Sequence, residues 1–211
     1  KGFSYMNSAL CAHEYTFYPY NEVGIAAGLQ VTADSFFDKV KKGLNAQHNN
    51  FKHSVLKDTS DVVKSGYKQK TKDGKWSIEG YQSAIHCRTM SNPEVFKGER
   101  LSVMVFEEAG EFKELLNAYM SSKACFMDGN VQFGVPVIGG TGGDIETSSK
   151  DFMEMYYNAD SFNLIPMFIP ASVCYYGFFD TKTGISNEKG AREELVEERK
   201  KLEGRDNSKA Y

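Results

Sequence analysis

The chain has 211 residues, of which 41% are hydrophobic, and this is enough for one α/β domain with a sizeable core. Its formal net charge of −3 excludes a uniformly basic nucleic-acid-binding protein, so any contact with DNA must come from a local basic face. No apolar run approaches the roughly 18 residues of a membrane span, and the four cysteines lack Cys-x-x-Cys spacing, which predicts reduced, mostly buried thiols.

The first part of the chain alternates between helical and strand-like patterns. Residues 1–15 predict a glycine-containing turn that leads into a helix, and residues 22–28 predict a short buried strand. A second helix is predicted over 32–44, with Thr32 or Asp34 as its N-cap. This order of strand and helix favours a parallel sheet.

The pattern changes over residues 47–80, where Asp73-Gly74 is a strong signal for a β-hairpin turn. Four lysines cluster around this turn beside Tyr67 and Trp76; they are Lys68, Lys70, Lys72 and Lys75. Two interpretations stay open. The cluster can meet a phosphate backbone, or the lysines can act as gatekeepers that keep a solvated hairpin from aggregating.

The most informative motif is the apolar run 101–110, which follows a predicted strand over 83–89 and contains Glu107 and Glu108 near its end. A continuous apolar run predicts a strand that is buried on both faces, as in a parallel sheet. Ligands of open α/β sheets gather at the carboxyl ends of such strands, where successive side chains point in roughly opposite directions. One carboxylate can therefore hold a metal ion while the other faces a water molecule, which is the Walker B arrangement of a P-loop ATPase.

The second half of the chain continues the α/β pattern and then loses it. A helix is predicted over 111–122, and a strand over 134–140 runs into a glycine-rich turn. A short helix over 149–157 precedes an apolar, proline-containing segment over 162–170 that is typical of an edge strand. Residues 190–211 carry opposite charges three and four positions apart and few apolar residues, which predicts a solvated helix or linker.

The histidines and the late aromatic residues do not suggest a further site. None of the histidines has zinc-ligand spacing, and we expect all of them to be unclustered and structural: His13, His48, His53 and His86. The aromatic run 175–179 is expected to pack in the core or at a sheet edge rather than to stack on nucleic-acid bases.

Three short motifs line up in an order that is uncommon by chance. Residues 2–4 (Gly-Phe-Ser) open a helix, whose N-terminus favours phosphate. Residues 107–108 follow a buried strand, and residues 139–143 (Gly-Gly-Thr-Gly-Gly) follow the next one, where glycine allows close approach to a ligand. With these motifs the chain resembles the ATPase domain of the large terminase subunit, the genome-packaging motor of tailed bacteriophages. The resemblance covers essentially all 211 residues and is strongest over 105–112 and 136–143.

The resemblance implies an α/β fold of the additional-strand P-loop NTPase type, with a mostly parallel central sheet and helices on both faces. Residues 1–185 would form the ATPase domain, and residues 186–211 a charged linker helix towards a nuclease domain. Such a domain hydrolyses ATP with Mg²⁺ to drive double-stranded DNA into a procapsid. Its expected partners are double-stranded DNA, the portal protein, the small terminase subunit and further copies in a homo-oligomeric ring, in the cytoplasm of the bacterial host and away from membranes.

The resemblance also implies roles for the first residues. Ser4 matches the P-loop hydroxyl that binds Mg²⁺, and Gly2 matches the glycine two places before it. Phe3 stands where the family has lysine, and Lys1 is the residue expected to reach the phosphates in its place. We expect residues before Lys1 to supply the first half of the loop.

Four further residues take roles from the resemblance. Glu107 matches the Walker B acid that reaches Mg²⁺, although the family usually has aspartate there, and Glu108 matches the catalytic acid. Thr141 falls in the motif that couples hydrolysis to movement. Arg100, just before the Walker B strand, is the candidate for an arginine given to the nucleotide of a neighbouring subunit.

Two other functions fit parts of the pattern. Another P-loop DNA motor, such as a helicase, would be expected to carry a second core domain, and none is predicted after residue 180. A non-catalytic phage structural or DNA-binding module with a decayed nucleotide site would explain Phe3, but not the retained pair Glu107-Glu108.

Overall fold

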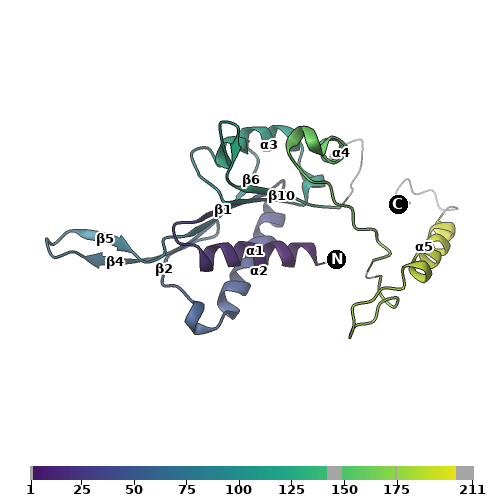
Figure 1. Cartoon of the computed structure of the whole chain (residues 1–211), viewed down its shortest axis with the longest axis horizontal. Coiled ribbons are helices and arrows are strands. Elements are labelled where there is room, and N and C mark those ends of the chain that lie inside the picture. Colours follow the sequence, from purple (N-terminus) through teal and green to yellow (C-terminus); the bar gives the residue numbers. More distant parts are fainter. Residues whose placement is uncertain (1, 142–148, 174, 203–211) are drawn as a thin grey trace. The chain divides into compact units, whose positions relative to one another are not determined.

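The computed structural model describes residues 2–141, 149–173 and 175–202. Its contacts divide the chain into a larger unit, Gly2–Asn163, and a smaller one that begins at Leu164. The larger unit is an α/β domain built around one main sheet (Figure 1). The domain boundary expected near residue 185 stays a prediction.

A six-stranded sheet forms the centre of the larger unit, in the order β10-β7-β1-β6-β3-β2. Its strands are β1 (Glu22–Ala27), β2 (Val55–Asp58), β3 (Val62–Ser65), β6 (Ala84–Thr89), β7 (Val103–Glu107) and β10 (Val135–Ile138). β10, β7, β1 and β6 run parallel, and β3 and β2 extend the sheet in antiparallel fashion beyond β6. The predicted α/β fold with a mostly parallel sheet is confirmed.

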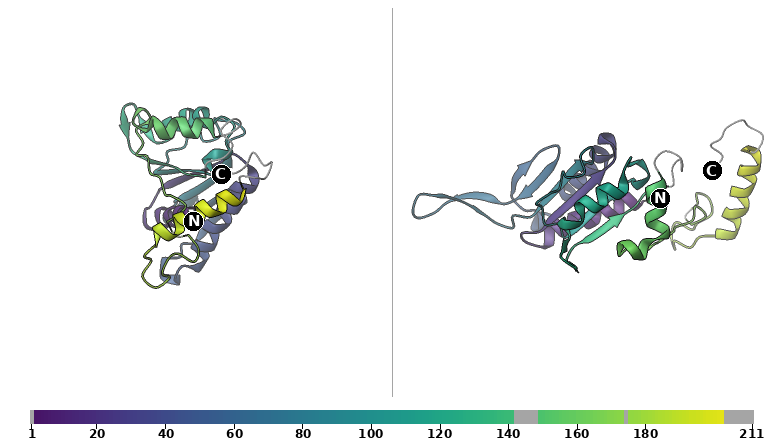
Figure 2. Two further views of the ribbon diagram at one scale, coloured as in Figure 1. Left: turned by 90° about the vertical axis from the view of Figure 1, so that its right-hand side faces the viewer. Right: turned by 90° about the horizontal axis from the view of Figure 1, so that it is seen from above.

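Helices cover both faces of this sheet, as Figures 1 and 2 show from different directions. The α-helices of the larger unit are α1 (Phe3–Phe17), α2 (Gln30–Ala46), α3 (Leu115–Ser122) and α4 (Lys150–Tyr157). α1 and α2 pack together on one face, where Val23, Ile25 and Ile85 belong to the main hydrophobic core. α3 and α4 lie over the other face, where the ring of Phe106 contacts that of Tyr119.

The predicted buried strand of the 101–110 run is β7. All five of its residues are buried, because β7 lies between β1 and β10 and has helices on both sides. This environment explains why the sequence shows a continuous apolar run instead of an alternating one. Glu107, the last residue of β7, is therefore a buried acid at the carboxyl edge of the sheet.

The predicted hairpin is also present, as an exposed ribbon of two strands outside the main sheet. It consists of β4 (Tyr67–Lys70) and β5 (Trp76–Glu79), and Gly74 in the turn has the left-handed conformation (φ 81°) that favours glycine. The remaining short elements are β8 (Met127–Asp128), β9 (Val131–Gln132), and the 3₁₀ turns η1 (Asn49–Phe51), η2 (Ala109–Glu111), η3 (Lys123–Cys125) and η4 (Ala159–Phe162).

The predicted N-cap of the second helix is wrong. α2 begins at Gln30, after Leu29, which makes no side-chain capping bond, so Thr32 and Asp34 already lie inside the first turns of the helix. The Thr32 hydroxyl donates instead to Glu111 Oε2 at 2.7 Å, and Asp34 accepts a hydrogen bond from Gln30. Both side chains therefore form hydrogen bonds with other side chains and do not cap the helix.

The predicted edge strand over 162–170 is also wrong. Residues 163–170 form no strand, and Ile165 is 95% exposed. Its prolines are compatible with an edge strand, but no described strand of the sheet pairs with this segment. The smaller unit continues from there into α5 (Glu188–Leu202), the predicted charged helix, where Glu198 accepts a hydrogen bond from the Tyr175 hydroxyl.

The cysteines behave as their spacing predicts. Cys11, Cys87 and Cys125 are buried and free, and burial raises the pKa of each thiol above its ordinary value. Cys174 lies outside the described residues. Within the described ranges, no helix combines the length and the apolar character needed to cross a bilayer.

Candidate functional site

The end of β7 and the start of α1 meet at the carboxyl edge of the sheet. α1 begins after Gly2, which is in the left-handed conformation (φ 93°), and Ser4 lies in its first turn. The hydroxyl of Ser4 donates a hydrogen bond to Oε1 of Glu107, although the two residues are 103 positions apart. The fold therefore brings together the two residues that the resemblance implies as Mg²⁺ ligands.

Glu107 is a buried carboxylate that forms no ion pair with any described residue. Glu107 is only 4% exposed. Among the described residues, its second carboxylate oxygen, Oε2, accepts no hydrogen bond. Burial raises the pKa of Glu107; the bond from Ser4 lowers it, the charge of Glu108 raises it again, and the result lies above the ordinary value. An incompletely paired buried carboxylate is unfavourable by itself, so this position gains from a bound cation.

Two neighbours reduce this imbalance without removing it. Asn7 lies one turn after Ser4 on α1, and its amide lowers the pKa of Glu107, although Asn7 Nδ2 is buried without a hydrogen bond of normal geometry. Lys39 on α2 contributes positive charge that also lowers this pKa. Sequence reasoning missed both residues, because only the packing of α1 and α2 on the same face of the sheet places them near Glu107.

Glu108 has a strained backbone and a separate partner. Its backbone is left-handed (φ 48°, ψ 59°), which is uncommon for a residue with a side chain and tends to occur at functional sites. Its Oε2 accepts from the backbone N–H of Thr141 at 3.3 Å, and the Thr141 hydroxyl lies 3.5 Å away. The two adjacent carboxylates are thus held by different elements, one by α1 and one by the loop after β10.

Two glycines let the loop after β10 approach β7 closely. A Cβ at Gly140 would lie 2.7 Å from the backbone nitrogen of Ala109, and Ala109 N–H donates to Gly139 O at 2.9 Å. A Cβ at Gly139 would overlap the ring of Phe3. Phe3, which stands where the family has lysine, therefore packs against this loop and joins the start of α1 to it.

Solved structures with the same fold come from phage large terminases. The ATPase domain of the Thermus phage P74-26 large terminase aligns with a TM-score of 0.57 and 13% identity, over 95% of this chain and 77% of that one. The HK97 bacteriophage large terminase aligns with a TM-score of 0.55 and 11% identity, over 96% of this chain and 42% of that one. The chain has the fold of phage large-terminase ATPase domains.

A third structure extends this comparison to a nucleotide complex. The large terminase of a thermophilic bacteriophage, solved in complex with ADP, aligns with a TM-score of 0.51 and 13% identity, over 90% of this chain and 40% of that one. No protein-family model and no curated protein matches the sequence. The structural alignments show the terminase fold. Because the sequence identities are low, the activity has to be argued from the site.

Arg100 lies at the other end of β7 in this terminase fold. It precedes the strand, and its exposed guanidinium lies 3.7 Å from Asp128 Oδ2 and over the ring of Phe133 at 4.3 Å. The length of β7 separates it from Glu107 and Glu108 of the same chain, so a role towards a neighbouring subunit stays a prediction. Lys1 lies outside the described residues, as do residues 142–148.

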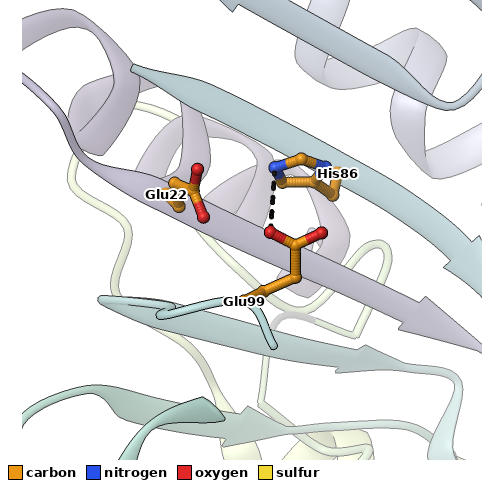
Figure 3. Close-up of side chains that lie close together, drawn as sticks. All are labelled: Glu22, His86 and Glu99. Atoms are coloured by element: carbon orange, nitrogen blue, oxygen red, sulfur yellow. Dashed lines mark ion pairs between the residues drawn. The ribbon is translucent and has the colours of Figure 1, made fainter. Parts of the chain in front are cut away.

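A second group of ionisable side chains lies near the amino end of the sheet. Figure 3 shows Glu22, at the start of β1, His86 on β6 and Glu99 turned towards one another, with His86 Nε2 3.9 Å from Glu99 Oε2. The expectation that His86 is unclustered is therefore wrong. The parallel register of β1 and β6, which places Gly24 opposite His86, brings these residues to one face, and the sequence does not reveal that register.

Glu99 in this amino-end cluster is paired with a cation, whereas Nε2 of His86 is buried without a hydrogen-bond partner among the described residues. Arg88 lies 2.9 Å from Glu99 Oε1 and also donates to the carbonyl of Val95. Burial alone would raise the pKa of Glu99, but Arg88 and His86 lower it below its ordinary value. Burial raises the pKa of Glu22, and the neighbouring Glu99 raises that pKa further.

Proposed function

We propose that this chain is the ATPase domain of a phage DNA-packaging motor, which hydrolyses ATP with Mg²⁺ to move double-stranded DNA into a procapsid. One observation carries the proposal. On a terminase ATPase fold, the carboxyl edge of the sheet brings Ser4 to Glu107, the two metal ligands that the resemblance implies, and Thr141 of the implied coupling motif to Glu108, the implied catalytic acid.

The residues present fit a magnesium nucleotide. Ser4 and Glu107 offer a hydroxyl and a carboxylate oxygen, the ligand types that Mg²⁺ prefers, and Oε2 of Glu107 is buried without a partner. When bound, Mg²⁺ would neutralise charge on the phosphates. Gly2 and the N-terminus of α1 would contact the phosphate groups through backbone N–H groups, and Lys1 would add positive charge. The ADP complex of the thermophilic phage terminase supports an adenine nucleotide as the ligand.

Glu108 would act on the attacking water. Its carboxylate would orient the water and accept its proton as the oxygen bonds to the γ-phosphorus and the bond from that phosphorus to the β-phosphate oxygen breaks, releasing ADP and phosphate. The contacts of Thr141 with Glu108 hold this carboxylate before reaction. A Thr141 that instead contacts the γ-phosphate would release Glu108, which links the nucleotide state to the loop after β10.

The assembled motor would use further residues of both units. Arg100 is exposed and would reach the nucleotide of a neighbouring subunit in a ring on the procapsid, where the portal protein and the small terminase subunit are the further partners. The charged helix α5 would belong to the linker over 186–211 that leads to a nuclease domain. The work would take place in the cytoplasm of the bacterial host.

A second candidate function has one observation in its favour. Phe3 occupies the lysine position and packs on Gly139, which fits a DNA-binding or structural phage module whose nucleotide site has decayed. The unpartnered oxygen of Glu107 and the strained Glu108 support the active site instead, because a decayed site has no reason to retain them.

Measuring hydrolysis and packaging together tests the proposal. Full-length protein would be mixed with its procapsid, linear duplex DNA, ATP and Mg²⁺, and released phosphate and nuclease-protected DNA would be followed. We expect Mg²⁺-dependent hydrolysis that accompanies protection. Binding of ATP with no hydrolysis above that of the Glu108→Gln protein would support the decayed site, and hydrolysis that never yields protected DNA would support another DNA motor.

A further inference from the structure

The β4–β5 hairpin is a part of the larger unit that the proposed ATPase chemistry does not use. It leaves the sheet after β3 and returns to it before β6, and Figures 1 and 2 show it extending away from the rest of the larger unit. All four residues of β4 are exposed, and so are three of the four in β5. Because β6 starts at the amino edge of the parallel strands, the hairpin lies at the opposite end of the sheet from Glu107.

The strand register sorts the hairpin side chains into two faces. Residues directly paired across an antiparallel ladder share a face, and successive residues alternate. Lys68 pairs with Ile78, and Lys70 pairs with Trp76. The opposite face is formed by the pairs Tyr67 with Glu79 and Gln69 with Ser77. We define the lysine face as Lys68, Lys70, Trp76 and Ile78; it contains no acid.

The charges of this ribbon are free to meet a ligand. In the described part of the chain, no ion pair involves any lysine of the hairpin, and Lys72 and Lys75 add two more at its turn. Asp73 is the one acid between residues 67 and 78. The nearby acid Glu79 lies on the opposite face. The lysine face is therefore a local basic surface on a chain whose net charge is −3.

The gatekeeper interpretation accounts for the lysines but not for the tryptophan. A ribbon that only needs to stay soluble would not place its largest apolar side chain on the exposed lysine face, yet Trp76 is 70% exposed there and Ile78 is 44% exposed. Aromatic and apolar groups interleaved with cations are the combination that contacts nucleic acids, since the cations meet phosphates and the ring meets sugar or base surface.

We propose that the lysine face, with Lys72 and Lys75, binds the backbone of double-stranded DNA. The choice of DNA as the partner rests on the proposed packaging function, and the geometry supports a duplex because a two-stranded β-ribbon fits the major groove. Each lysine contacts a phosphate without reading base identity. The binding is therefore independent of sequence, as a motor that moves along DNA requires.

The single tryptophan of the chain makes this inference directly measurable. Because Trp76 lies on the lysine face, its fluorescence reports on the hairpin alone. We would titrate the 211-residue chain with linear duplex DNA of random sequence, single-stranded DNA of the same length and polyglutamate, at several salt concentrations. We expect the emission of Trp76 to change with duplex DNA at the lowest concentration, and log Kd to depend linearly on log salt with a slope of about 3 to 4.

Two variants with the same change in net charge separate a defined face from bulk charge. Lys68→Gln with Lys70→Gln removes two positive charges from the lysine face, and Gln69→Glu with Ser77→Glu adds two negative charges to the opposite face. We expect the first variant to weaken duplex binding about 10- to 100-fold at about 0.1 M salt and to reduce the salt slope by about 2. The second should keep the wild-type slope. Circular dichroism and unchanged Trp76 emission without DNA check that each ribbon folds.

Each other result overturns the inference. Equal weakening by both variants would mean that net charge alone controls binding. Tighter binding of single strands or of polyglutamate would assign the hairpin to a different partner. Unchanged Trp76 emission with duplex DNA would show that the lysine face does not contact the duplex. Hydrolysis of ATP by full-length protein is measured separately. A chain that binds duplex DNA through this face but never hydrolyses ATP would contradict the proposed function and leave this inference intact.

Discussion

The two ends of the central sheet each carry a pair of carboxyl groups, and the pairs differ in how their charge is balanced. At the amino end, Arg88 lies 2.9 Å from Glu99, which lowers the pKa of Glu99 below its ordinary value. At the carboxyl end, Glu107 is more deeply buried; among the described residues, a serine hydroxyl is its hydrogen-bond partner and one oxygen has none.

We expect this difference to distinguish a charge-paired cluster from a ligand site on the same strands. In the amino-end cluster an arginine is paired with Glu99, although Nε2 of His86 is buried without a hydrogen-bond partner among the described residues. The carboxyl end is incomplete without a cation, and Glu108 beside it is held in a strained conformation. Uncompensated buried charge and backbone strain are typical of functional sites, where a ligand supplies the missing interaction.

A large effect on turnover is expected for Arg100, which lies towards the amino end in its own chain but would serve the carboxyl end of a neighbour. Arg100→Ala should lower kcat by a factor of about 10³ in the assembled motor, because an arginine supplied in trans stabilises the transition state. Mixing Arg100→Ala subunits with Glu108→Gln subunits should restore part of the activity. No recovery at any ratio, in rings shown to be mixed, would argue against a role in trans.

Glu108 should show a loss that is confined to turnover. Glu108→Gln keeps the size and shape of the side chain and its contact with Thr141 but removes the charge that accepts a proton, so kcat should fall about 10²- to 10⁴-fold. The affinity for ATP should stay within a few-fold of wild type. Glu94→Gln, a change at an exposed acid outside the site, is the control. Hydrolysis by Glu108→Gln within a few-fold of wild type would make the acid pair structural.

Arg88 should matter for stability and not for nucleotide binding. Arg88→Gln removes the charge-assisted bond to Glu99 and should lower the free energy of unfolding by about 2 kcal/mol, against less than about 0.5 kcal/mol for the exposed Arg192→Gln. The lowered pKa of Glu99 contributes stability above its unfolded value of 4.5, and this is lost as the pH falls through the folded pKa. Urea unfolding should therefore show a larger effect at pH 7 than at pH 4.

The stability contribution of Glu107 should change with pH in the opposite direction. Its pKa is raised by burial, so its contribution to stability is present below the unfolded value of 4.5 and is lost as the pH rises through the folded pKa. Glu107→Gln, which is neutral throughout, should stabilise the protein without ligand by about 1 kcal/mol at pH 7.5 and have little effect at pH 4. Destabilisation at pH 7.5 would show that Glu107 is already balanced, like the amino-end cluster.

Local patterns made much of the fold predictable. The run 101–110 reads as a doubly buried strand because burial on both faces suppresses alternation, and Asp73-Gly74 fixes the hairpin because the turn needs a left-handed residue. The predictions failed where a distant partner decides. The sequence predicts Thr32 as an N-cap, but its hydroxyl donates to the distant Glu111. It predicts an edge strand over 162–170, but no described strand pairs with these residues.

The candidate site was predictable only through motif order. The positions of Ser4 and Glu107 follow from the resemblance, and the fold brings them into contact. The influence of Asn7 and Lys39 on Glu107 depends on how two helices pack on one face, and the cluster around His86 depends on a strand register. Neither arrangement leaves a periodic or local signal in the sequence.

Calorimetric titration of full-length protein with ATP, with and without Mg²⁺, tests the central contrast between the two ends most directly. Wild type, Glu107→Gln and Glu99→Gln would be compared, since each substitution neutralises one acid of one pair. We predict that Glu107→Gln loses the part of the affinity that depends on Mg²⁺, about tenfold or more for a lost metal ligand, while Glu99→Gln keeps it. Equal Mg²⁺-dependent affinity in all three proteins would contradict the assignment of the carboxyl end as the metal and nucleotide site.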